Sequence, residues 1–194
     1  MNAGAVTEIR NTRSKIHPKQ FALLVACASI MMMFAAWTSA YIVRQAAGNW
    51  LEFRMPDLFF VSTAVILLSS LTLHSSYISF KRGNESMYKL LLVATFILGI
   101  AFLVLQYMGW QAMIEIGVPL KTNPSGDFVY MISGAHALHI LGGIAVLMVA
   151  MLHAFILKFN PTPARKLRFE LTLTYWHFVD LLWVYLLLFL TLQG

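Results

Sequence analysis

Apolar residues gather in five long stretches, which are separated by short segments punctuated by glycine, proline and asparagine. The stretches cover residues 21–43, 58–80, 90–114, 128–157 and 171–192. Each reaches the ~20 residues that an α-helix needs to cross about 30 Å of hydrocarbon. Apolar side chains occupy every side of each stretch, as in helices that face lipid or a protein interior. Since a backbone in lipid must satisfy its own hydrogen bonds, the pattern predicts five transmembrane α-helices.

The alternatives to a helical membrane bundle find little support. Barrel strands would read as segments of about ten residues with alternating polarity, and none is present. A cleavable signal peptide would have a shorter apolar run than residues 21–43. We therefore expect an all-α fold, a polytopic integral membrane bundle over residues 21–194, preceded by a basic segment at residues 1–20. No connecting segment is long enough to hold a soluble catalytic domain, and no internal repeat suggests a transporter with two inverted halves.

Composition agrees with this interpretation. Hydrophobic residues make up 59% of the chain and charged residues only 11%, against about 45–50% and about 25% in soluble domains. Disorder is therefore excluded, and a water-soluble globule could not hide so much apolar surface. The single cysteine, Cys27, excludes an intramolecular disulfide and a multi-cysteine metal site.

The net charge of +6 follows from the distribution of basic residues between the two sides of the membrane. Eleven of the 14 Lys and Arg residues fall before the first stretch or in the second and fourth connections, and three fall on the other side. Basic residues are retained on the cytoplasmic side, which places the N-terminus in the cytoplasm and the C-terminus outside. Because topology explains the charge, we do not expect a nucleic-acid partner.

Ionisable residues inside the stretches are the candidate functional residues, because they cost free energy in the membrane. Two pairs have a spacing of three residues, His136 with His139 and His177 with Asp180. Residues three apart share one helix face. At 1.5 Å per residue, both pairs fall near the middle of the membrane, so a contact between Asp180 and His139 is geometrically possible.

These four residues allow more than one interpretation. Histidine and carboxylate ligate metals, and two facing histidines could hold a haem. Alternatively, the four form a hydrogen-bonded polar core that locks two helices together, which is the commoner role of polar groups in membranes. A proton relay through Asp180 would need carriers across the full depth, and there is only one deep acid. We favour the structural polar core and expect no catalytic, cofactor-binding or metal-ligating residue.

The last stretch carries a specific resemblance. Tyr175-Trp176-His177-Phe178-Val179-Asp180, followed by two apolar residues and Trp183, resembles the closing motif of subunit III of the haem–copper oxidases. In the fourth stretch, His136-Ala137-Leu138-His139 followed by Gly142-Gly143 resembles a second motif of that family. The resemblance covers roughly residues 25–194 and indicates the short form with five helices.

The resemblance implies a function. Subunit III of this family is an accessory subunit without haem or copper, which lie in partner subunits. It binds chiefly subunit I, in a complex with subunit II, holds phospholipid in a cleft and sustains proton uptake. The complex reduces oxygen to water, pumps protons and takes electrons from cytochrome c or quinol. We expect a cytochrome c oxidase of a bacterial cytoplasmic membrane, with a quinol oxidase as the alternative.

The helices around the polar core should pack closely. We expect Gly142 and Gly143 to allow close approach, and Tyr175, Trp176 and Trp183 to support the last helix. Two positions depart from the family, which often has glutamates where this chain has Ile30 and Gly109. Roles of those acids in proton handling therefore do not transfer to this chain.

Two further functions stay open at the level of sequence. A small membrane transporter would have a polar cavity at mid-membrane and would act alone. A haem-b membrane anchor would use histidines of this chain, such as His74 or His139, to hold haem.

Overall fold

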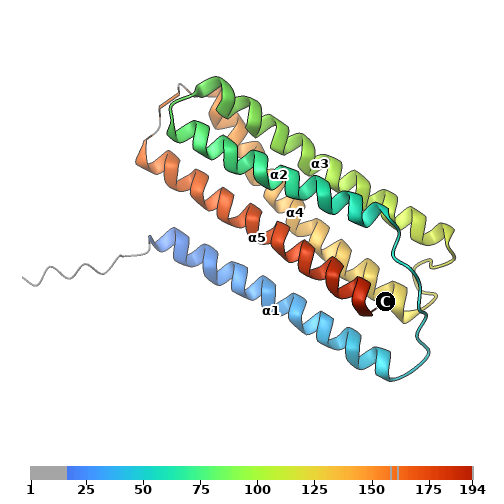
Figure 1. Cartoon of the computed structure of the whole chain (residues 1–194). Coiled ribbons are helices and arrows are strands. Elements are labelled where there is room, and N and C mark those ends of the chain that lie inside the picture. The colour runs from blue at the N-terminus through green and yellow to red at the C-terminus, as the bar shows by residue number, and fades with distance from the viewer. Residues whose placement is uncertain (1–16, 158, 161, 194) are drawn as a thin grey trace, which may run out of the picture.

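Five α-helices form the structure (Figure 1), a computed structural model that describes residues 17–157, 159–160 and 162–193. They are α1 (Pro18–Ala46), α2 (Leu58–Lys81), α3 (Glu85–Glu115), α4 (Pro124–Ile156) and α5 (Pro163–Gln193). The described residues contain no strand. All five helices are long and apolar enough to cross a membrane. The predicted all-α fold is confirmed, and the chain is a multi-pass membrane protein.

The helices extend beyond the apolar stretches that predict them. The first turns of α3, α4 and α5 come before the apolar stretches, close to glycine, asparagine or proline. They are formed by residues 85–89, 124–127 and 163–170, respectively. Asn84 and Asn123 cap α3 and α4, since their side chains accept hydrogen bonds from the backbone amides of Met87 and Ser125. These polar first turns lie at the ends of the bundle. Most of the predicted segment 1–20 lies outside the described residues.

The helices are not equally embedded. α2 packs against α3 and α5, and α4 packs against the same two helices, so that α2 to α5 form a closed group. α1 contacts only α4 and α5 among the described helices and lies along one side of this group (Figure 1). Much of its surface is exposed, and Met32 is 74% exposed. The shared core is therefore built by α2 to α5.

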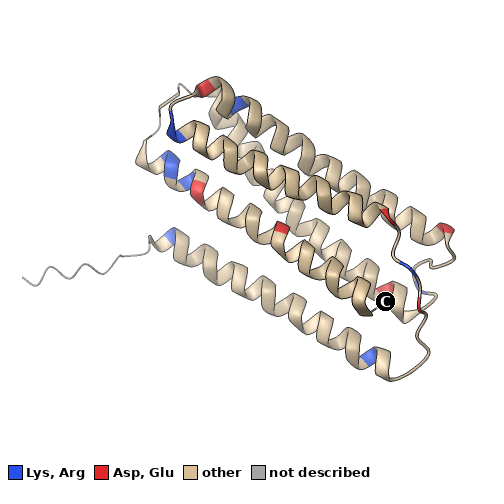
Figure 2. Cartoon of the chain, viewed as in Figure 1, with Lys and Arg blue, Asp and Glu red and all other residues tan. Residues whose placement is uncertain are grey.

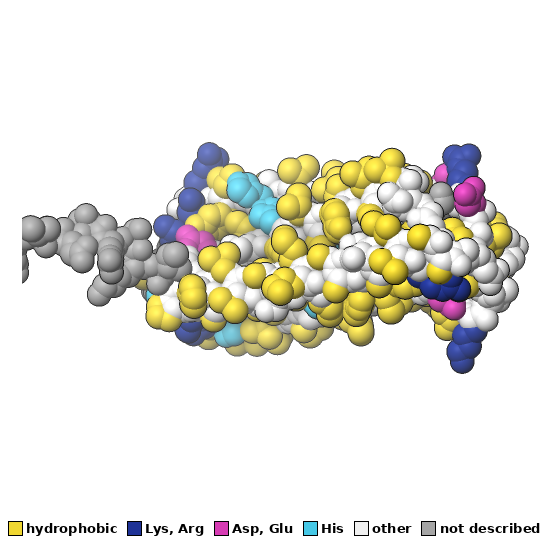
Figure 3. Space-filling model, turned by 90° about the horizontal axis from the view of Figure 1, so that it is seen from below, with side chains coloured by type: hydrophobic (Ala, Val, Ile, Leu, Met, Phe, Trp, Pro, Cys, Tyr) yellow, Lys and Arg dark blue, Asp and Glu magenta, His cyan; other side chains and the backbone are white. Residues whose placement is uncertain are grey.

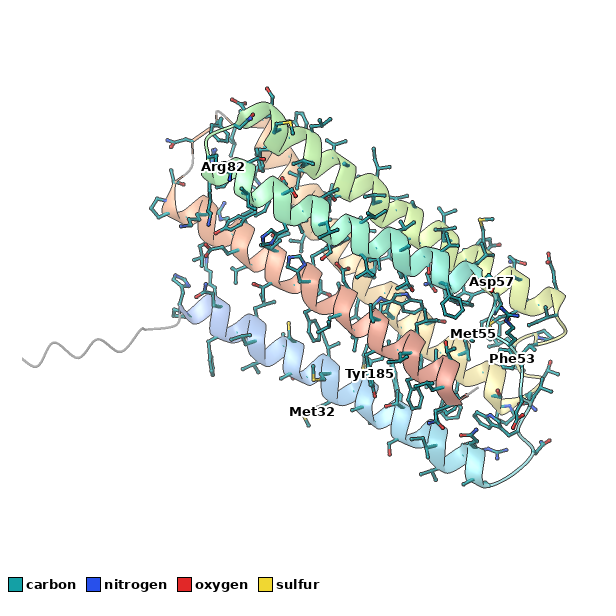
Figure 4. The ribbon with its side chains drawn as sticks, in the orientation of Figure 1. Met32, Phe53, Met55, Asp57, Arg82 and Tyr185 are labelled. Atoms are coloured by element: carbon teal, nitrogen blue, oxygen red, sulfur yellow. The ribbon has the colours of Figure 1, made fainter. Side chains whose placement is uncertain are left out.

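Charged residues lie at the two ends of the bundle (Figure 2). We name the end where α1, α3 and α5 begin the amino-terminal end and the other the opposite end. Arg82 and Asp57 flank α2 and lie at these two ends respectively (Figure 4). Between the two ends, the face of the molecule in Figure 3 carries many apolar side chains. Asp180 is the one described charged residue in the middle of a helix.

Candidate functional site

The buried face of α5 brings the predicted residues into the centre of the bundle. Trp176 is fully buried, and its indole Nε1 donates to Ser69 Oγ of α2 at 3.2 Å. A Cβ atom on Gly99 of α3 would lie 3.0 Å from this indole, and one on Gly143 of α4 would lie 2.9 Å from it. The ring therefore fits between α3 and α4 because glycine, which has no side chain, leaves room for it at both positions. Trp176 joins α5 to α2, α3 and α4.

Trp183, two turns further along α5, makes a similar set of contacts. Its Nε1 donates to Thr63 Oγ1 at 2.9 Å, and its ring stacks on the imidazole of His136, with centroids 5.0 Å apart. The Phe102 ring of α3 meets it edge-on, at 5.5 Å between centroids. Aromatic pairs of this kind add about 0.5–1.5 kcal/mol beyond area burial. Both tryptophans join α5 to its neighbours, and the role that the sequence predicts for them, support of the last helix, stays a prediction.

The polar contacts between α2 and α5 repeat at intervals of six or seven residues. Thr63, Ser70 and Tyr77 of α2 bond to Trp183, His177 and Glu170 of α5, respectively. The two helices run in opposite directions, so the order is reversed along α5. Six or seven residues make about two helical turns, so one face of each helix stays toward its partner along these contacts. We call this row of contacts the α2–α5 seam.

The sequence analysis missed the contribution of α2 to this seam. Pairs of hydroxyl residues occur on α2 at 62–63, 69–70 and 76–77. Two of the hydroxyl residues of α2 also bond to Thr95 of α3. Ser69 Oγ donates to the Thr95 carbonyl, and Thr72 Oγ1 pairs with the Thr95 hydroxyl. The seven-residue spacing of these hydroxyls was the available signal. It predicts that α2 has polar contacts along its length.

The four residues of the predicted polar core lie at similar depth but are not directly bonded to one another. His177 pairs with Ser70 of α2, and His139 Nδ1 donates to the carbonyl of Ala135 within α4 at 2.7 Å. Neither ring nitrogen of His136 and neither carboxylate oxygen of Asp180 has a hydrogen-bond partner. The Ser70 hydroxyl is near enough to Asp180 to interact with it, although without hydrogen-bond geometry.

His136 and Asp180 are both deeply buried, at 0% and 2% exposure. A buried polar group without a partner costs about 1–3 kcal/mol, and an ionised one costs more. In native proteins such groups are usually satisfied by water when no side chain reaches them. A direct link between α4 and α5 comes instead from Tyr175, whose hydroxyl donates to the carbonyl of His139 at 3.0 Å.

The described residues contain no group of three or more His, Cys, Asp or Glu side chains placed to hold a metal ion. His136 is enclosed by the rings of Phe34, Phe102 and Trp183. His139 also lies against Phe34, at 5.6 Å between centroids. The two histidines of α4 therefore face aromatic side chains of three other helices, and their environment is that of packed core residues.

The two departures from the family pattern have distinct surroundings. A Cβ atom on Gly109 of α3 would lie 3.0 Å from the ring of Phe59, which is fully buried. The longer side chain of a glutamate would have to displace that ring. Ile30 on α1 is partly buried against the core. The space that an acid would occupy at position 109 is taken by an aromatic ring.

A groove of about 560 Å³ opens near the amino-terminal end, between α4, α5 and Leu23 of α1. Its walls are mostly apolar and include Val146, Ala150 and Leu171. Arg165 and Arg168 line it at the start of α5. It therefore combines an apolar channel with basic side chains at the end of the bundle.

Comparison with known proteins finds relatives along most of the chain. The family model described as cytochrome c oxidase subunit III matches residues 51–194, which include α2 to α5. A probable cytochrome c oxidase subunit 3 of Mycobacterium tuberculosis is 28% identical over 167 residues, covering 83% of this chain and 81% of the relative. One of Nocardia farcinica is 25% identical over 190 residues, covering 93% and 90%. A cytochrome c oxidase subunit 3 of Gallus gallus is 32% identical over 126 residues, covering 65% of this chain and 46% of that protein.

Proposed function

Because the chain belongs to the cytochrome c oxidase subunit III family, we propose that it is the non-catalytic accessory subunit of a respiratory haem–copper oxidase. The observation that supports this role is the use of the α5 motif. The indole nitrogens of Trp176 and Trp183 donate hydrogen bonds to α2, and His177 bonds to Ser70 of the same helix. Side chains committed to helix contacts hold a shape rather than perform chemistry. Haem and copper then belong to the partner subunits.

The partners follow from this proposal. The main contact is with subunit I, within a complex that also contains subunit II and pumps protons while reducing oxygen to water. The electron donor to the complex is cytochrome c, as the names of the relatives suggest, rather than quinol. The donor reacts with the partner subunits and not with this chain.

Phospholipid is the ligand that the groove near Arg168 suits. An acyl chain matches its apolar walls, and a phosphate matches the basic side chains where the groove reaches the end of the bundle. The lipid would extend from Arg168 toward mid-membrane, along α4. Its role would be to fill a surface that α1 leaves uncovered.

The membrane placement is that of a bacterial cytoplasmic membrane protein with its N-terminus inside. Of the ten Lys and Arg residues in the described ranges, seven lie at the amino-terminal end. Four of the seven described acids lie at the opposite end. This asymmetry follows the positive-inside rule.

The polar core that the sequence predicts belongs to this proposal, with bridging water in place of some of the direct bonds. His136 and Asp180 stabilise the junction of α4 and α5 through bridging water, whereas His177 bonds to Ser70 of α2 and His139 to the carbonyl of Ala135 in its own helix. The support is the burial of four polar atoms of His136 and Asp180 without partners. Replacing Asp180 by leucine would test whether this junction contributes to assembly.

Isolation of the intact complex tests the proposed function. The tagged chain, purified from membranes in mild detergent, should bring down larger subunits that show haem bands in a reduced-minus-oxidised spectrum. The bands should disappear when the chain is stripped from its partners, and phospholipid should remain bound in native mass spectra of the complex. A haem band that stayed with the isolated chain would instead favour a haem anchor. Solute uptake by the chain alone would favour a transporter.

A further inference from the structure

The exposed side of the α2–α5 pair carries apolar side chains and two histidines. On α5, Leu181 and Leu188 are 70% and 58% exposed, and His177 lies four residues before Leu181. The two helices lie side by side (Figure 1), and the rings of His74 and His177 are 5.8 Å apart between centroids. On α2, the exposed residues form one stripe, which consists of Phe60, Ala64, Leu67, Leu71 and His74. We call the surface formed by these residues the α2–α5 outer face.

His74 lies within the part of α2 that the hydrocarbon of a membrane covers. The 24 residues of α2 extend about 36 Å, so a hydrocarbon layer of about 30 Å covers all but the ends of the helix. His74 precedes Lys81 by seven residues, which is about 10 Å along the helix axis. An imidazole is too short to reach the lipid headgroups from this depth. Its ring nitrogens therefore face acyl chains, which neither donate nor accept hydrogen bonds, unless another protein covers them.

His74 has no hydrogen-bond partner within the part of the chain that the structure describes, and its contact with His177 is one between rings. Ser29, which is exposed on α1, bonds instead to its own helix, since its Oγ donates to the carbonyl of Val25 at 3.0 Å. Thr174 on α5 bonds to its own helix in the same way. A polar group that faces lipid costs free energy, and such groups in membrane proteins are usually paired. His74 therefore needs a partner that this chain does not supply.

The charges near His74 favour a partner with an acidic side chain. Lys81 lies at the end of α2 and Arg168 lies near the start of α5, both at the amino-terminal end. The nearby acid of this chain, Glu170, already accepts a hydrogen bond from Tyr77. A carboxylate can accept a hydrogen bond from an imidazole N–H, and it would be attracted by the two cations. A lysine or arginine at the same place would be repelled.

We propose that the α2–α5 outer face docks a transmembrane helix of a partner chain, which presents an apolar stripe to α2 and α5 and an aspartate or glutamate to His74. The stripe on α2 alternates steps of four and three residues, which is the spacing at which one helix packs along another. An apolar stripe alone would suit lipid equally well, so His74 decides between lipid and protein. His177 beside it already bonds to Ser70, which leaves His74 as the group that the carboxylate of the partner reaches.

This inference assigns a contact surface that the proposed function leaves open, and it rests on that function only in requiring a complex of membrane proteins. The test uses photoreactive benzoylphenylalanine in place of Leu71, which is 64% exposed and lies one turn from His74. The full chain is irradiated in its native membrane, and the adduct is identified by mass spectrometry. We expect attachment to a transmembrane helix of another protein, with an aspartate or glutamate within two turns of the attached residue. Leu67, on the same stripe, provides a second position if the bulk of the label at position 71 blocks docking.

Two substitutions test the role of the histidine. His74→Leu should lower the yield of the adduct by at least about threefold, which corresponds to an average hydrogen bond between membrane helices. The same substitution should leave the chain alone in detergent at least as stable as before, because leucine suits an apolar environment. Ser29→Leu is the matched control, since it also replaces an exposed polar residue of a helix, and it should leave the yield unchanged.

Adducts at positions 71 and 67 with lipid only, or with a second copy of this chain, would overturn the proposal. An adduct with a helix that has no acid near the attachment would also overturn it, and so would an unchanged yield in His74→Leu. Haem bands in the purified complex separate this inference from the proposed function. If the bands are present and both positions give only lipid adducts, the accessory role stands and the docking surface is wrong. If the bands are absent but the expected adduct forms, the docking surface stands and the accessory role is wrong.

Discussion

Glycines of α4 that look equivalent in the sequence differ in what they contact. A Cβ atom on Gly143 would lie 2.9 Å from the Trp176 ring, whereas one on Gly134 would lie 3.9 Å from its nearest neighbour in Trp110. The nearest contact of Gly142 is the Tyr175 hydroxyl, at 3.8 Å. The sequence shows that small residues belong on this helix. It does not show which of them faces the largest side chain of the core.

This difference predicts the effect of alanine at each position. Gly143→Ala should lower the unfolding free energy by about 1–3 kcal/mol, because Trp176 is held by α2, α3 and α4 and cannot move aside. Gly134→Ala is the matched control and should be neutral or slightly stabilising, since alanine favours helix over glycine. Unfolding in mixed detergent, followed by tryptophan fluorescence, measures both. Equal effects of the two substitutions would contradict this account.

At the scale of helices, the α2–α5 seam explains why α5 is the most buried helix. Half of the residues in the most apolar 18-residue segment of α5 are buried, compared with 17% in the corresponding segment of α1. Lipid provides no hydrophobic driving force between helices, so hydrogen bonds and close packing hold the pair together. The partners of α5 that the sequence analysis favoured were the histidines of α4. The structure assigns its polar bonds mainly to α2.

Removal of the Ser69 hydroxyl, which lies next to the seam and bonds to Trp176, should weaken the pairing of α2 and α5. Ser69→Ala removes the acceptor for Trp176 Nε1 and the donor to the Thr95 carbonyl. We expect a loss of about 0.6–1.7 kcal/mol, from the average to the largest value measured for hydrogen bonds between membrane helices. Ser75, which is exposed on the same helix, provides the control Ser75→Ala. A double-mutant cycle with Trp176→Phe should show coupling for Ser69 and none for Ser75.

At the scale of the whole molecule, the separation of charge between the two ends predicts orientation. In a Cys27→Ser background, we expect Asp57→Cys to react with a membrane-impermeant maleimide on intact cells, because Asp57 lies at the opposite end. Arg82→Cys lies at the amino-terminal end and should react only after the membrane is permeabilised. Labelling of Arg82→Cys from outside would reverse the proposed topology.

The sequence alone determined the class of protein, the number of helices and the family. Five apolar stretches leave no other structure that satisfies a backbone in lipid, and the motif from Tyr175 to Trp183 is specific enough to indicate subunit III. These features are local, because they depend on the order of residues within one helix. The packing roles that the sequence predicts for Trp176, Trp183 and Gly143 stay predictions, because they depend on contacts between helices.

Only the tertiary structure decided which helices meet. Residues three apart share a helix face, but spacing does not reveal which neighbour that face contacts, so His177 pairs with Ser70 and not with Asp180 or His139. The ends of the helices also depended on the folded chain, because asparagine and proline can either cap a helix or form a loop. Helix pairing brings together residues more than 100 positions apart, and their contacts are set by packing rather than by local pattern.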